Sequence, residues 1–510
     1  YEILRCLVGS EMCIRDRNFI RTRRRMAEEA AGKKSSFLPT ATQGNTRLIF
    51  LIKRSNIQYA LKINKEVKSL KNLLKKINGS KDLTEGNPMK LILNFGLPLL
   101  FGLLFQQFYN MVDTIIVGKF LGVDALAAVG STGSINFMIL GFCIGICNGF
   151  AIPVAQAFGA KDTDNMKKYI TNCVWASIFF AAVMTVAVGI LTRNILIWMK
   201  TPDSILDQAF IYIFIIFMGI PATFLYNMVS GILRSLGDSV TPVVCLIASS
   251  LLNIVLDILL VRPMGVAGAA VATVVAQAIS GVGCLIYMCK KLGYLHFTKQ
   301  DWAFSMRHCL TLCGMGVPMG LQYSITAIGS VILQAAVNSM GESVIAAVSA
   351  GTKISMFLCC PFDAMGSTMA TYGGQNVGAK KMDRVDAGLK ACIKLGIAYA
   401  ILAFVFILLF GKNLALLFLD AEETEIIKLV YYFLLGNSGA YILLALVNIV
   451  RFMIQGLGYS AFAVIAGICE MVARTIAGFI LVPKFGYVFV ALGSPLAWIF
   501  ADIFLIPAYI

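Results

Sequence analysis

The chain has 510 residues, of which 58% are hydrophobic and only 14% charged, and its mean hydropathy is +0.80. Soluble domains carry about 25% charged residues, so this composition excludes a soluble globular fold and indicates a polytopic membrane protein. The net charge of +16 gives no reason to expect a nucleic-acid partner, because residues 1–81 hold 19 Lys and Arg against 6 Asp and Glu, or +13, which leaves +3 for the other 429 residues.

Residues 1–81 form a basic leader ahead of the apolar part of the chain. The leader has no membrane-length apolar run and no small-residue cleavage site after an apolar core, so we do not expect a signal peptide. Residues 6–17, CLVGSEMCIRDR, resemble translated sequencing-adapter sequence. Residues 63–77 have the pattern of a basic amphipathic helix on an anionic membrane surface, but we favour a leader that is disordered or in part an artefact.

Twelve apolar runs of membrane-helix length, about 20 residues or more each, follow the leader. They divide six and six between residues 82–300 and 301–510, which we expect to form two six-helix bundles. The sequence therefore predicts an all-α polytopic membrane protein with twelve transmembrane helices. The runs cover residues 90–112, 126–158, 169–192, 208–231, 240–261, 267–289, 309–337, 344–377, 387–410, 426–449, 460–482 and 488–510.

Charge in the connecting loops predicts the orientation of these runs. Loops after even-numbered runs hold thirteen Lys and Arg residues, whereas loops after odd-numbered runs hold six. Cytoplasmic loops carry the excess of positive charge, so we expect a multi-pass protein of the inner (plasma) membrane with both termini in the cytoplasm. The thirteen are Lys161, Lys167, Lys168, Arg234, Lys290, Lys291, Lys299, Arg307, Lys380, Lys381, Arg384, Lys390 and Arg451, and the six are Lys119, Arg193, Lys200, Arg262, Lys412 and Lys484.

The two halves repeat each other at a separation of about 220 residues, and the best matches lie in polar loops. Six runs per half give both repeats the same orientation, which is an architecture of secondary transporters with the substrate path between the halves. The matching segments are FGLP (95–98) with MGVP (315–318), AQAFGAKDTD (155–164) with GQNVGAKKMD (374–383), and RSLGDS (234–239) with QGLGYS (455–460).

The first run carries polar residues on one helical face. Gln106, Asn110 and Asp113 follow at i, i+4 and i+7, with Tyr109 beside them. A carboxylate at the bilayer centre costs roughly 2.5–3.5 kcal/mol on insertion scales, so Asp113 is either a cap at the outer helix end or a functional residue. Pro98 in the same run offers a point at which the helix can bend.

The fifth run places Asn253 and Asp257 one helical turn apart. At 1.5 Å per residue, Asp113 lies about 33 Å and Asp257 about 26 Å along their helices, so we expect both in the outer half of the membrane. Two neighbouring carboxylates can bind a proton near neutral pH, or hold Na⁺ with help from amide oxygens. The sequence therefore predicts a cation site at Asp113 and Asp257.

The second half has other charges in place of this pair of acids. Leu333 and Gly478 stand at the equivalent positions. Glu470 and Arg474 lie one turn apart on the eleventh run, where we expect them to form a structural ion pair. Asp363, near the middle of the eighth run, is a weaker candidate for a functional residue.

Neither a metal centre nor an enzyme active site is indicated. The chain has fourteen Cys and two His, but it has no CxxC, and most Cys lie singly in apolar runs as packing residues. We find no HExxH and no GxSxG motif. We therefore expect no catalytic residue, and no cofactor besides a coupling ion.

From about residue 82 to the end, the chain resembles the multidrug and toxic compound extrusion (MATE) family of secondary transporters. The resemblance rests on FGLPLLFGLLFQQFYNMVDTIIVGKFLGVDALAAVG, on the loops QAFGAKD and QNVGAKK, and on ILRSLGDSVTP with NIVLD. It implies two six-helix bundles in a V around a central cavity. It also implies efflux of cationic or amphipathic small molecules in exchange for H⁺ or Na⁺.

The resemblance implies roles for individual residues as well. The family's cation-site acids on helices 1 and 5 match Asp113 and Asp257. Some members also use acids on helices 7 and 10, and this chain has none there. The other matched positions are Gln106, Tyr109 and Asn253 around the acids, Pro98 as the kinking proline, and, more loosely, Asn227 and Thr273.

A flippase for a lipid-linked precursor, from the same superfamily, is the alternative function. It would favour several arginines along the cavity to hold a pyrophosphate, and the runs contain few, chiefly Arg474. In either case we expect a monomer whose partners are small molecules and membrane lipid, with no nucleic acid.

Overall fold

The computed structural model describes residues 82–199, 201–291, 297–419 and 421–510. The basic leader, with its adapter-like segment and its expected amphipathic helix, lies outside the described residues. All regular structure in the described part of the chain is helical, and these residues belong to one compact unit.

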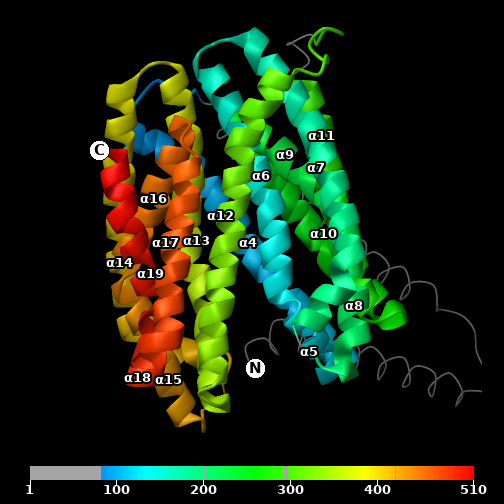
Figure 1. Cartoon of the computed structure of the whole chain (residues 1–510), viewed down its shortest axis with the longest axis vertical. Coiled ribbons are helices and arrows are strands. Elements are labelled where there is room, and N and C mark those ends of the chain that lie inside the picture. The colour runs from blue at the N-terminus through cyan, green and yellow to red at the C-terminus, as the bar shows by residue number, and fades with distance from the viewer. Residues whose placement is uncertain (1–81, 200, 292–296, 420) are drawn as a thin grey trace, which may run out of the picture. The chain divides into compact units, whose positions relative to one another are not determined.

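Ten of the described helices are long and apolar enough to cross a membrane, and two bent helix pairs bring the number to twelve. The expectation of an all-α protein with twelve spans is therefore confirmed (Figure 1). The first half consists of α4 (Pro88–Leu121), α5 (Val123–Ser131), α6 (Gly133–Gly159), α7 (Thr163–Trp198), α8 (Asp203–Met218), α9 (Ile220–Ser235), α10 (Val240–Met264) and α11 (Val266–Lys291). The second half consists of α12 (Met306–Asn338), α13 (Glu342–Gly378), α14 (Met382–Ala415), α15 (Thr424–Gly439), α16 (Tyr441–Leu457), α17 (Ala461–Ile476), the π-helical turn η2 (Ala477–Leu481), α18 (Val482–Phe485) and α19 (Tyr487–Tyr509).

The internal repeat is visible in the way the fourth span of each half is broken. α8 and α9 meet at Gly219 with a bend of 43°, and α15 and α16 meet at Gly439 and Ala440 with a bend of 48°. The turns that follow α6 and α13 also match, because Lys161 and Lys380 both adopt left-handed backbone angles, with φ of 56° and 58°.

Helices α6 and α12 run side by side through the centre of the molecule and join the two halves (Figure 1). Their backbones approach so closely that a Cβ atom on Gly149 would lie 2.5 Å from the Cα atom of Gly316. Both positions therefore require glycine.

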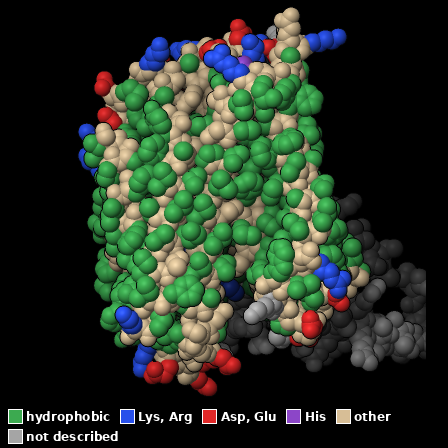
Figure 2. Space-filling model, in the orientation of Figure 1, with side chains coloured by type: hydrophobic (Ala, Val, Ile, Leu, Met, Phe, Trp, Pro, Cys, Tyr) green, Lys and Arg blue, Asp and Glu red, His purple; other side chains and the backbone are tan. Residues whose placement is uncertain are grey.

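One end of the molecule is rich in cations, and we call it the basic end. It is the end at which α6 turns into α7 and α13 turns into α14, where Lys161, Lys168, Lys380, Lys381 and Arg384 lie. Figure 2 shows that charged side chains lie mainly at two rims, separated by a broad hydrophobic belt. This distribution is that of a protein that spans a membrane.

Two of the thirteen cations that we expected in loops lie in the interior of the molecule instead. Arg234 is half-buried on α9 and Arg451 is buried on α16, since both helices extend several residues beyond the apolar runs. Without these two, eleven cations follow the even-numbered runs against six after the odd-numbered runs, so the asymmetry of charge between the two sets of loops persists. Of those six, Lys200 lies outside the described residues.

The halves close against each other at the basic end through equivalent contacts. The side-chain amide of Gln156, on α6, donates a hydrogen bond to the carbonyl oxygen of Gly456, 3.0 Å away. Its counterpart Gln375, on α13, donates to the carbonyl oxygen of Ser235 at 2.8 Å. The repeated loops found in the sequence are thus the parts of each half that meet across the interface.

Candidate functional site

Helix α4 carries the polar face expected from the sequence. The side chain of Asn87 caps its start by accepting hydrogen bonds from the backbone N–H groups of Met89 and Lys90, and the helix then continues unbroken through Pro98. Tyr109 is half-buried and interacts with the side chains of Gln106 and Asp113. The bending role of Pro98 stays a prediction.

Helix α10, which packs along α4, supplies the second acid. Asp257 has 0% of its surface exposed, and Asn253, one turn before it, is also buried. Among the described residues, neither the two carboxylate oxygens of Asp257 nor the two side-chain polar atoms of Asn253 have a hydrogen-bond partner. Buried polar atoms are nearly always paired in proteins, so this turn of α10 is suited to bind a ligand.

The two carboxylates lie close enough to interact electrostatically. One oxygen of Asp113 is likewise buried and without a partner in the described part of the chain. The same group includes Tyr109 and also Tyr212 of α8, a buried residue that interacts with both acids. Sequence reasoning missed Tyr212, because it lies in the apolar stretch of α8, residues 209–218, and only the fold brings it to this place.

A small cavity, partly open to solvent, adjoins the site. Tyr109, Asn253 and Thr273 contribute to its walls, together with serine hydroxyl groups from α10 and α11. The hydroxyl group of Thr273 also donates to the carbonyl oxygen of Ala269, 3.1 Å away. The cavity therefore lies beside the turn of α10 that carries the unpaired atoms.

Two other predicted site residues contribute less to this arrangement. Asn110 is exposed. Asn227 donates its side-chain amide to the carbonyl oxygen of Thr223 on its own helix, at 2.8 Å, and is not among the residues that line the cavity.

The donor atoms at this site are carboxylate, amide and hydroxyl oxygens. Hard cations prefer such oxygen ligands, and a proton can be shared by neighbouring carboxylates. In the described residues no three His, Cys, Asp or Glu side chains come together as a metal site. The chemistry of the site thus suits H⁺ or Na⁺ better than a transition metal.

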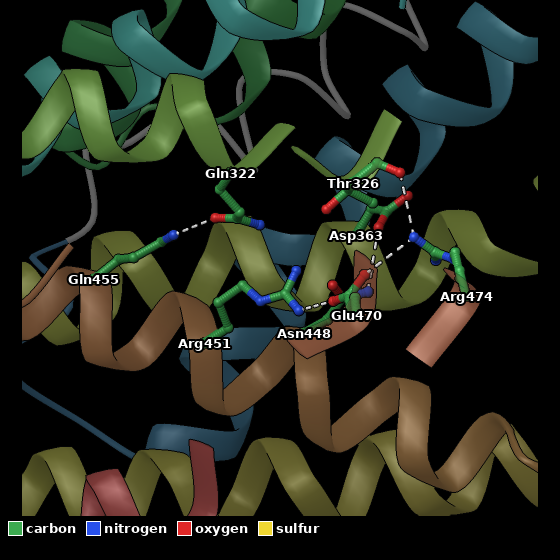
Figure 3. A network of polar contacts seen from close by, with 8 residues as sticks. All are labelled: Gln322, Thr326, Asp363, Asn448, Arg451, Gln455, Glu470 and Arg474. Atoms are coloured by element: carbon green, nitrogen blue, oxygen red, sulfur yellow. Dashed lines mark hydrogen bonds and ion pairs between the residues drawn. The ribbon is translucent and has the colours of Figure 1, made fainter. Parts of the chain in front are cut away.

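The second half contains a buried charged network (Figure 3). Glu470 of α17 accepts a hydrogen bond from Arg451 of α16 and lies 3.5 Å from Arg474 on its own helix. The expected pair of Glu470 with Arg474 is therefore present, but Arg451 shares the carboxylate. Asp363 of α13 accepts a hydrogen bond from the amide of Asn448, at 3.3 Å.

Asp502 of α19 also belongs to this network and was missed in the sequence. It is 4% exposed, it interacts electrostatically with Arg451 and Glu470, and neither of its oxygens has a hydrogen-bond partner among the described residues. The sequence could have indicated Asp502 as a candidate site residue, because it is a lone acid in the last apolar run.

Comparison with known proteins identifies the family. The MatE family model matches residues 98–259 and 318–480, once in each half. "Probable multidrug resistance protein YpnP" of Bacillus subtilis is 30% identical over 346 residues, which are 67% of this chain and 77% of that protein. The "FAD transporter" of Shewanella oneidensis is 22% identical over 75% of this chain and 85% of its own length.

Solved structures share the fold. One, described as the outward-facing conformation of a multidrug resistance MATE family transporter, has a TM-score of 0.79 at 22% identity and covers 85% of this chain and 97% of that one. The MATE-like twelve-helix fold expected from the sequence is thereby confirmed, and the function is transport and not enzymatic catalysis. The chain belongs to the multidrug and toxic compound extrusion family of membrane transporters.

Proposed function

We propose that this transporter is an antiporter that extrudes cationic or amphipathic small molecules in exchange for H⁺ or Na⁺, with Asp113 and Asp257 as the coupling site. The observation that carries the proposal is the pair of neighbouring carboxylates with unpaired buried oxygens, next to the unpaired amide of Asn253. A buried charge without a partner is costly, so such a site favours a bound cation or proton.

Coupling follows from the charge of this site. Two carboxylates repel each other across the packed helices α4 and α10, and a bound cation removes that repulsion. Cation and substrate then compete by favouring different conformations, and each shifts the equilibrium by its difference in affinity between them. The closed basic end supports a state in which the cavity opens toward the opposite end.

The orientation in the membrane is part of the proposal. With eleven cations near the basic end against six in the other loops, the positive-inside rule favours a basic end in the cytoplasm, together with both termini. Efflux from the cytoplasm of a cell across its plasma membrane then requires the basic end to open for loading.

The test is dye efflux from cells and from vesicles with Asp113→Asn and Asp257→Asn. We expect both variants to lose cation-dependent efflux of a cationic dye, because an amide cannot take up the positive charge. Asp207→Asn is the control, since Asp207 is an exposed acid whose side chain is 85% accessible. Efflux that keeps its full cation dependence in both site variants would refute the coupling site.

A second measurement selects the coupling ion. Wild-type efflux is compared with and without Na⁺ at fixed pH, and then across a pH gradient without Na⁺. Dependence on only one of the two ions assigns it as the exchanged ion.

The flippase alternative has less support, because it favours several arginines that are free to hold a pyrophosphate. Arg451 and Arg474 do not meet this condition, since both contact Glu470 and share their charge with that carboxylate.

A further inference from the structure

Arg234 of α9 lines a cavity between the two halves near the basic end. The cavity is partly open to solvent, and its walls come from α6, α9, α12, α13 and α16. Its polar lining consists of Arg234, Asn148, Ser235, Ser367 and Thr371, and no acidic side chain is among the lining residues of the described chain. The cavity is thus separate from the pair of acids in the first half.

The guanidinium group of Arg234 has no carboxylate partner in the described part of the protein. It donates one hydrogen bond, from Nη2 to the side-chain oxygen of Asn148, at 2.9 Å. The acid nearest to it in sequence, Asp238, is already engaged by Lys291 at 2.7 Å and by the backbone N–H of Thr241 at 3.0 Å. Arg234 therefore differs from Arg451 and Arg474, which both contact Glu470.

The repeat shows that the fold does not need this charge. Wall residues of the cavity are equivalent in the two halves: Asn148 corresponds to Ser367 at an offset of 219, and Gly231 to Phe452 at an offset of 221. At the second offset, Arg234 corresponds to Gln455, which is neutral. Gln455 is buried and bonds instead to Gln322, at 2.7 Å.

The chemistry of an unpaired guanidinium indicates its ligand. Charged residues inside a membrane protein are costly and usually mark a substrate path or find a partner. The planar fork of arginine matches carboxylate and phosphate groups and binds them through two parallel hydrogen bonds. Beside it, the hydroxyl group of Ser235 already donates to the carbonyl oxygen of Ala151 at 2.6 Å, and Arg234 is the one charged side chain among the lining residues of the described chain.

We propose that Arg234, held by Asn148, is a binding site for the anionic group, a carboxylate or a phosphate ester, of a transported compound. The transported compounds would then include zwitterionic or anionic amphiphiles beside cationic ones. This inference deepens the proposed function and rests on it for its physiological meaning, but the binding itself is measured without transport.

The test is equilibrium binding of riboflavin and flavin mononucleotide to the purified full chain in neutral detergent, followed by flavin fluorescence polarisation. The two probes differ only by a phosphate monoester. We expect the parent protein to bind the phosphate form more tightly. Arg234→Gln is expected to weaken its binding roughly 10- to 100-fold, the range for a lost charge-assisted hydrogen bond, and to leave riboflavin binding within about twofold.

Two further variants complete the test. Arg234→Lys keeps the charge but loses the fork, and we expect it to fall between the parent and Arg234→Gln. Arg307→Gln removes an exposed cation near the same end and is expected to change neither affinity. Unchanged riboflavin binding in Arg234→Gln shows that the variant is folded.

Three results would overturn the inference. The first is equal binding of the two flavins by the parent protein, and the second is phosphate-dependent binding that survives Arg234→Gln. The third is displacement of flavin mononucleotide by phosphatidylglycerol but not by inorganic phosphate, because that result would assign the site to a lipid headgroup. Failure of the aspartate variants in the efflux test concerns coupling alone and leaves this binding result in place.

Discussion

Closure of the basic end depends on two glycines that are equivalent in the repeat, and Gly378→Ala is expected to destabilise the closed state. A Cβ atom on Gly378 would lie 1.9 Å from the carbonyl oxygen of Gln156. A Cβ atom on Gly159, its counterpart in α6, would lie 1.9 Å from the carbonyl oxygen of Gln375. The atom in the way is backbone in both cases, so no rotation of a side chain can relieve the clash.

The size of the effect follows from the geometry. Real Cβ contacts are essentially never shorter than 3.0 Å, so the helices must separate by at least 1.1 Å, the difference between 3.0 and 1.9 Å. The same displacement would lengthen the bonds from Gln156 to Gly456 and from Gln375 to Ser235, now 3.0 and 2.8 Å, beyond hydrogen-bond length. Each bond contributes about 1 kcal/mol, so the closed state loses about 2 kcal/mol, or roughly 30-fold in population.

The assay measures access to the closed interface from the basic end. Ser235→Cys, in a cysteine-free background, places a thiol at a buried position of the interface with little change in shape. Vesicles with the basic end outward are treated with a membrane-impermeant maleimide. We expect Gly378→Ala to label roughly 30-fold faster than the parent, if opening precedes the reaction.

Gly314→Ala is the matched control, because Gly314 is also a helical glycine but a Cβ atom added to it would meet nothing within 4 Å among the described residues. It should label at the parent rate. Equal labelling of Gly378→Ala and Gly314→Ala would refute the idea that glycine contact closes this end.

Two further predictions concern stability. Glu470→Gln removes the carboxylate shared by two buried guanidinium groups and is expected to cost about 3–5 kcal/mol, seen as a lower Tm in detergent. Glu425→Gln, which breaks only an exposed pair with Lys428, should change stability by less than about 1 kcal/mol, and similar losses in both variants would contradict this assignment. Asp162→Ala is expected to cost about 1 kcal/mol at neutral pH, because Asp162 caps α7 by accepting from the backbone N–H of Asn165. That hydrogen bond holds the pKa of Asp162 below its usual value of 3.8. The charged cap therefore stabilises the fold above pH 3.8, and this stabilisation is lost as the pH falls through the folded-state pKa. If Asp162→Ala still lowered the stability below that pKa, the result would argue against a charged cap.

The spans of this protein could be predicted from sequence because a lipid environment requires long apolar helices. The ends of the spans could not. The tenth run was expected to end at residue 449, yet α16 continues to Leu457 and carries Arg451 into the interior. An arginine ends an apolar run by composition, but it is accommodated inside the protein when Glu470 on a neighbouring helix provides a carboxylate. Composition along one helix cannot reveal a partner on another.

Part of the candidate cation site could also be predicted from the sequence, because acids are conspicuous in apolar runs. Asp113 and Asp257 stand out as acids in apolar runs, and helical spacing places Gln106, Tyr109 and Asn253 near them. The contribution of Tyr212 depends on how α8 packs, and a tyrosine in an apolar helix gives no distinguishing signal.

The repeat separates what the fold needs from what transport needs. Contacts that close the basic end occur in equivalent pairs, Gln156 with Gln375 and Gly159 with Gly378, because each half must present the same surface to the other. The unpaired charges break this symmetry. A substrate and a coupling ion have no twofold symmetry, so the groups that bind them need occur only once.

That asymmetry argues for a division of labour between the halves. Asp113, Asp257 and Arg234, which have no oppositely charged partner among the described residues, lie in the first half, and the equivalent residues Leu333, Gly478 and Gln455 are uncharged. The second half also holds a buried acid without a hydrogen-bond partner, Asp502, but that acid interacts electrostatically with Arg451. In the second half the guanidinium groups share a protein carboxylate, which fixes helices to one another. We therefore propose that the first half is the one whose packing responds to bound charge.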